Sequence, residues 1–82
     1  MTNMTFEEEK SGIVKITFKI DRMPHPDSRH LSSRLFPIGR VMEYDDVHIT
    51  IITRKPVELV DYVTGYLTDR NVKLNEYNEV AY

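Results

Sequence analysis

The sequence predicts an α+β fold, a ferredoxin-like βαββαβ sandwich in which a four-stranded antiparallel sheet carries both helices on one face. Two observations predict this arrangement. Four segments with strand patterning and two with helical spacing follow one another as strand, helix, strand, strand, helix, strand. The first and third strand candidates, residues 13–20 and 47–53, are the most apolar. In this topology they are the central strands, whereas edge strands are usually shorter or more polar.

The first strand lies in "GIVKITFKID", residues 12–21. Its apolar side chains alternate with lysine and threonine, which is the period of a strand with one buried face. These side chains are Val14, Ile16, Phe18 and Ile20. Residues 1–11 are polar and contain three consecutive glutamates, so we expect a flexible acidic tail before a single domain of residues 12–82.

The first helix is expected within "DSRHLSSRLF", residues 27–36. Asp27 or Ser28 is a good N-cap for this helix. Leu31 and Leu35 are four residues apart and so lie on one helical face, and Pro37 would end the helix. If residues 22–37 form a loop instead, the fold is β-grasp-like. The sequence alone leaves this alternative open.

A hairpin follows, with strands at residues 38–44 and 47–53 joined by two aspartates. In its second strand Val47, Ile49 and Ile51 point to one face of the sheet, and His48, Thr50 and Ile52 point to the other.

The clearest helix spans residues 55–71, with Pro56 in its first turn and Asn71 as its C-cap. Gly65 interrupts this helix, and we expect close packing onto the sheet to explain it. A short last strand is predicted at residues 72–77. The expected centre of the core consists of Ile16, Phe18, Ile49, Ile51, Val63 and Leu67.

Composition excludes several classes of protein. The chain has no cysteine, which removes disulfide scaffolds, thiolate catalysis and cysteine-based zinc sites. No apolar run approaches the roughly 18 residues that cross a membrane, and the first ten residues do not resemble a secretory signal. We therefore expect a cytoplasmic protein with no membrane contact.

No motif predicts catalysis or cofactor binding. Asp27, Ser28 and His30 are the residue types of a nucleophilic triad, but on one short helix they cannot point at one another as a triad requires. His25 and His30 flank Asp27, with His48 as a remote third group, in a spacing that matches no metal signature. We expect no enzyme activity, metal or cofactor.

The charge is distributed unevenly. Segment 22–40 carries four arginines against one aspartate, whereas residues 41–82 carry four basic and eight acidic side chains. Arginine binds carboxylates bidentately. The predicted partner-binding residues are Arg22, Arg29, His30, Arg34 and Arg40, and the expected partner is a larger protein with an acidic surface. The predicted function is that of a small binding module, an inhibitor or adaptor acting by protein–protein contact.

The sheet face opposite the helices offers a second surface. Its outward residues include Lys15, Lys19, His48 and Ile52, and we expect it or an edge strand to support a homodimer. Two alternatives stay open. Segment 22–40 could bind nucleic acid, although this sheet face lacks the aromatic side chains on which bases usually stack. The start of the first helix could bind phosphate or another small anion.

Overall fold

The computed structural model describes residues 12–82. The predicted acidic tail, residues 1–11, lies outside the described residues. The described chain forms four strands and two helices, which are β1 (Val14–Ile20), α2 (His25–Arg34), β2 (Gly39–Tyr44), β3 (His48–Thr53), α3 (Pro56–Asp69) and β4 (Leu74–Ala81).

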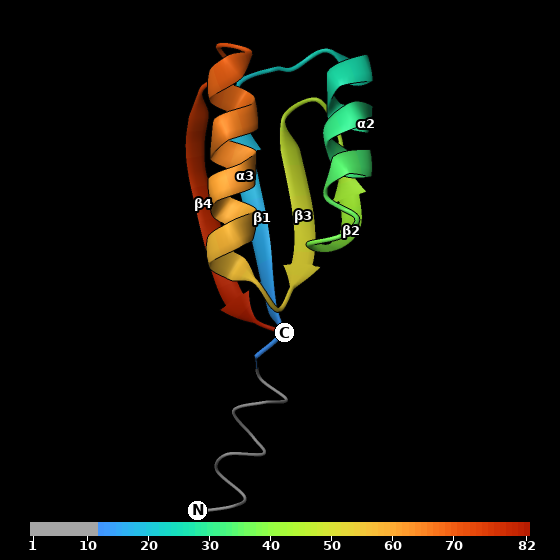
Figure 1. Cartoon of the computed structure of the whole chain (residues 1–82). Coiled ribbons are helices and arrows are strands. Elements are labelled where there is room, and N and C mark those ends of the chain that lie inside the picture. The colour runs from blue at the N-terminus through green and yellow to red at the C-terminus, as the bar shows by residue number, and fades with distance from the viewer. Residues whose placement is uncertain (1–11) are drawn as a thin grey trace, which may run out of the picture.

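The strands form one antiparallel sheet in the order β2-β3-β1-β4, and both helices cover the same face (Figure 1). The predicted α+β arrangement is confirmed, and β1 and β3 occupy the centre as expected. The β-grasp alternative is wrong because the segment that it treats as a loop contains the helix His25–Arg34.

The core lies between the sheet and the helices. All six residues predicted for its centre are at most 1% exposed, and the largest of them is Phe18. Met23, Leu31, Leu35 and Leu59 extend it from the helices and from the link before α2, and Ile20 and Tyr66 also belong to it. The alternation of β1 and β3 therefore places one face of each central strand in this core, as the sequence predicts.

The start of α2 differs from the prediction. The helix begins at His25, its N-cap is Pro24, and no side chain caps it. Pro26 fits here because the first N–H groups of a helix have no partner within the helix, so a residue without N–H loses nothing. The predicted caps lie inside the first turns, where the Ser28 hydroxyl is buried and donates to the carbonyl oxygen of Asp45 at 3.4 Å.

The end of α3 follows a known geometry. Asn71 adopts a left-handed conformation with φ of 59°, one residue beyond the C-cap Arg70. The Val72 N–H donates to the carbonyl of Leu67, and the Asn71 N–H donates to that of Thr68. This pair of bonds is the Schellman motif, and asparagine is the second choice after glycine at its left-handed position.

Two further expectations need correction. A Cβ on Gly65 would meet no atom within 4 Å, so this glycine does not pack onto the sheet. β4 also continues to Ala81 instead of ending at residue 77, because β1 supplies hydrogen-bonding partners along the whole of it, from Leu74 to Ala81. Strand pairing thus outweighs the polar character of the last residues.

Candidate functional site

The five predicted partner-binding residues do not form one patch. Arg22 lies in the link between β1 and α2, where its Nη1 is 2.8 Å from Oδ2 of Asp46. This ion pair joins the end of β1 to the β2–β3 turn. Arg22 therefore has a carboxylate partner within its own chain, at the opposite end of the sheet from Arg40.

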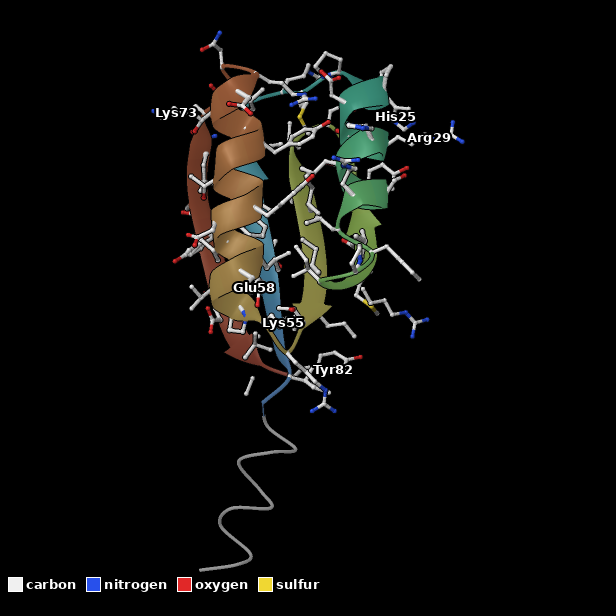
Figure 2. The ribbon with its side chains drawn as sticks, viewed as in Figure 1. His25, Arg29, Lys55, Glu58, Lys73 and Tyr82 are labelled. Atoms are coloured by element: carbon white, nitrogen blue, oxygen red, sulfur yellow. The ribbon has the colours of Figure 1, made fainter. Side chains whose placement is uncertain are left out.

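Arg29 and Arg34 point in different directions, because positions five apart on a helix diverge by about 140°. Arg29 projects away from α3, as does His25 (Figure 2). Arg34 turns toward α3, and its Nε donates to the hydroxyl oxygen of Tyr62 at 3.3 Å. That hydrogen bond raises the pKa of the Arg34 guanidinium. The two arginines therefore lie on different sides of α2, and their contact with a partner stays a prediction.

His30 also faces α3. Its Nδ1 lies 2.7 Å from the hydroxyl oxygen of Tyr66, whose ring stacks with that of Tyr62. The guanidinium carbon of Arg70 sits 3.6 Å from the centroid of the Tyr66 ring, a cation–π contact. His30 and Arg34 therefore help to join the two helices, and this role accounts for their position without a partner.

Arg40 belongs to a different group of cations, which the sequence analysis did not bring together. A hollow of about 340 Å³ opens at the end of the domain where α3 begins. Lys55 marks this end in Figure 2. The hollow, called the basic hollow below, is lined by Ile13, Phe36, Pro37, Ile38, Gly39, Arg40, Ile52, Thr53, Arg54 and Lys55.

Two small residues build the basic hollow. A Cβ on Gly39 would lie 2.6 Å from the carbonyl oxygen of Ile52, so only glycine allows β2 to approach β3 this closely. Thr53 is 3% exposed, and its hydroxyl donates to the carbonyl of Ile38 and accepts from the N–H of Lys55, both at 2.8 Å. Thr53 thereby holds the α2–β2 link beside the start of α3.

The basic hollow combines positive charge with exposed apolar surface. Arg40, Arg54 and Lys55 are all exposed, and no acidic residue is among those that line it. None of the three forms an ion pair with a carboxylate of residues 12–82. Phe36 is 83% exposed at its rim. Exposed arginine and aromatic side chains are the types that dominate binding energy at protein interfaces.

The open sheet face carries mixed charge. Lys19 Nζ lies 3.4 Å from Oε2 of Glu76, and His48 Nδ1 lies 3.0 Å from Oδ1 of Asp45. Lys15 is exposed, while Ile52 is half-buried and also lines the basic hollow. Nothing in the described residues tests the predicted homodimer through this face, which stays a prediction.

Sequence reasoning missed Phe36, Arg54 and Lys55. A signal was present: an aromatic residue stands before Pro37, and an Arg-Lys pair stands before Pro56, both outside the helices. Within residues 12–82, no group of three histidine or acidic side chains is placed to hold a metal ion. Neither α2 nor α3 has the length and apolar character of a membrane span.

Comparison with known proteins adds no assignment. No protein-family model matches the sequence, and no curated protein matches it. The candidate function therefore depends on the geometry and the charge of the basic hollow.

Proposed function

We propose that the protein is a non-enzymatic binding module that acts by protein–protein contact, as an inhibitor or adaptor of a larger protein with an acidic surface. One observation carries the proposal: Arg40, Arg54 and Lys55 surround an apolar hollow with an exposed phenylalanine at its rim. The contact surface is thus the basic hollow, in place of the arginines of α2.

Each component has a separate part in recognition. Two guanidinium groups bind carboxylates bidentately and so select for geometry as well as charge. Phe36 offers a large apolar side chain that is exposed in the free protein, so its burial against a partner is favourable. Cations around the rim raise the association rate with an acidic surface.

A capture experiment with charge-reversed variants tests this surface. The immobilised chain is exposed to extract of its native cell, and bound proteins are compared between the wild type and Arg54→Glu/Lys55→Glu. We expect the variant to lose the partner that the wild type captures. The matched control is Arg29→Glu/Lys73→Glu, which changes the net charge equally at exposed positions away from the basic hollow.

The partner's affinity then gives the apolar contribution. Phe36→Ala should weaken binding by about 2 kcal/mol, roughly thirtyfold, which is the size expected of an interface hot spot. If the partner binds Arg54→Glu/Lys55→Glu as well as the wild type and loses affinity for Arg29→Glu/Lys73→Glu, the contact surface includes Arg29 or Lys73 and does not lie at the basic hollow.

Nucleic acid and small anions are the alternatives, and salt separates them from a protein partner. Three cations bound to the phosphates of single-stranded nucleic acid would give a slope of about −2 in log K against log salt. A phosphate site would raise the melting temperature as phosphate is added, by mass action. A protein-contact module shows neither effect with these probes alone.

A further inference from the structure

The outer edge of β4 presents backbone groups without a strand partner. The Tyr82 N–H donates to the carbonyl of Ile13, which continues the register between β4 and β1. In an antiparallel pair every second residue bonds to the neighbouring strand, and the residues between point their N–H and C=O groups the other way. No other strand of residues 12–82 lies on that side of β4. The residues whose backbone groups face this open edge are therefore Tyr77, Glu79 and Ala81.

A hollow of about 270 Å³ lies beside this edge, between α3 and β4. In Figure 1, β4 is the outermost strand on this side of the sheet and α3 lies next to it. Val57 is 74% exposed and Tyr77 is 45% exposed, so apolar surface is uncovered here. The hollow, called the edge groove below, is lined by Pro56, Val57, Val60, Asp61, Tyr77 and Glu79.

The edge groove is acidic. Asp61 of α3 and Glu79 of β4 both line it, and neither carboxylate forms an ion pair within residues 12–82. None of the described residues that line it is basic. A charge on an edge strand protects against aggregation, which accounts for Glu79 but not for Asp61 on the helix. The two carboxylates together indicate a site for a cationic group.

A second copy of the chain does not match this surface. The sequence of β4, LNEYNEVA, contains two glutamates and no lysine or arginine. A second β4 paired with the open edge would therefore bring further carboxylates to the edge groove without a cation to compensate them, and like charges on neighbouring strands are unfavourable. A strand that carries lysine or arginine is the complement of this edge.

We propose that β4 and the edge groove bind an extended basic segment of a partner protein, which adds to the sheet as a further antiparallel strand. Directly opposite residues of an antiparallel pair share a face, so segment residues opposite Tyr77 and Glu79 place their side chains on the helical side. The recognised segment then has an apolar residue beside Val57 and Tyr77. Two positions away it has a lysine or arginine beside Asp61 and Glu79. The edge groove shares no lining residue with the basic hollow, so this proposal does not depend on the proposed function.

Hydrogen exchange of the full-length chain tests the strand addition. The probe is a synthetic peptide of two Thr-Lys-Thr-Val repeats, which is as long as β4. In the free chain the amides of Asn78 and Val80 should exchange slowly, because they bond to β1, and those of Tyr77 and Glu79 should exchange rapidly. The peptide should slow Tyr77 and Glu79, and the same peptide with glutamate for lysine should not. Unchanged exchange at millimolar lysine peptide, or slow exchange of both amides in the free chain, would overturn the proposal.

Methylated peptides test the direction of pairing. In the antiparallel arrangement the lysine and valine residues lie opposite Tyr77 and Glu79, so their N–H groups point toward β4. Methylation of the lysine and valine amide nitrogens should abolish binding, whereas methylation of the threonine nitrogens should preserve it. If both methylated peptides bind like the parent, or if only the threonine-methylated peptide fails, no antiparallel strand is added.

Charge variants test the edge groove itself. Asp61→Asn/Glu79→Gln should weaken binding of the lysine peptide about fivefold, since exposed ion pairs are individually weak. Glu43→Gln/Asp69→Asn removes the same charge at exposed positions outside the edge groove and should bind like the wild type. Equal losses in the two variants would show that the peptide responds only to net charge. Phe36→Ala at the basic hollow should keep the wild-type affinity for the peptide, so this result and the proposed function fail independently.

Discussion

His30 Nδ1 lies 2.7 Å from the hydroxyl oxygen of Tyr66, and that hydroxyl donates to the carbonyl oxygen of Asp27 at 3.2 Å. A hydroxyl has one proton and a carbonyl can only accept, so Tyr66 must accept from His30. His30 therefore carries a proton on Nδ1. Burial raises the pKa of the Tyr66 hydroxyl, which keeps this donor protonated.

Tyr66→Phe should destabilise the protein. The substitution leaves the ring in the core but removes both hydrogen bonds, and each is worth about 0.5–1.5 kcal/mol. We expect a loss of about 1–2 kcal/mol in the free energy of unfolding, measured by urea denaturation. Tyr82→Phe, at an exposed hydroxyl, is the control. An unchanged midpoint for Tyr66→Phe would show that the hydroxyl does not join the helices in solution.

Phe18→Ala tests the core. Phe18 is 0% exposed and is the largest of the fully buried side chains. Its truncation should cost about 3–5 kcal/mol, a large share of the stability of so small a domain. Phe36→Ala removes the same atoms from an exposed position and should change stability by less than about 0.5 kcal/mol. Equal melting temperatures for the two variants would contradict the assignment of the inward face of β1.

The two described glycines in regular elements should respond oppositely to alanine. Gly65→Ala adds a methyl group into open space within α3, so it should stabilise the protein by about 1 kcal/mol. Gly39→Ala forces a Cβ against the carbonyl oxygen of Ile52 and should cost about 1–3 kcal/mol. Thermal unfolding of both variants measures the difference, and a destabilising Gly65→Ala would mean that this face of α3 is covered.

Acid should weaken the β2–β3 turn through Asp45. Its Oδ1 accepts from the N–H groups of Val47 and His48, both at 2.9 Å. These bonds, with that of Val47 the largest cause, hold the pKa of Asp45 below its usual value. A group with a depressed folded-state pKa contributes stability above its unfolded pKa of about 3.9 and loses it as the pH falls through the folded value.

Melting curves of Asp45→Ala follow this loss. The gap in melting temperature between wild type and variant should be constant above about pH 5 and narrow below about pH 4, as the pH falls from the unfolded pKa toward the lowered folded-state pKa. Asp61→Ala, at an exposed position on α3, is the control for the charge change. A gap that stays constant down to pH 2 would show that the two N–H bonds do not form in solution.

The fold was predictable because its main signals are local. The alternation in β1 and β3 and the spacing of Leu31 and Leu35 each depend on a few neighbouring residues. The side chains at the centre of these patterns are buried in the structure, as predicted. The start of α2 was not predictable by the same rule. The helix begins at His25, before Asp27 and Ser28, so neither of these side chains stands at the N-cap position, which Pro24 occupies. The buried Ser28 hydroxyl donates to the carbonyl oxygen of Asp45 instead.

The site was much less predictable than the fold. Clustering in the sequence grouped Arg29 with Arg34, but the helical period separates them. Arg40 instead joins Arg54 and Lys55, and only the β2–β3 pairing and the Thr53 hydrogen bonds bring these three together. Such contacts between distant segments depend on register, which composition and charge counts do not contain.

β4 pairs with β1 from Leu74 to Ala81. It is an edge strand, because no other strand of residues 12–82 pairs with its second side. A strand in this position offers its backbone groups to any similar strand, which is the usual start of aggregation. Glu76 lies opposite Lys19 on the open face, and Glu79 lies opposite Ile16 on the helical face, so each face of the strand carries a carboxylate. These two charges oppose the stacking of identical chains into longer sheets. Removing both charges, as in Glu76→Gln/Glu79→Gln, should therefore remove that protection and speed fibril formation relative to the wild type.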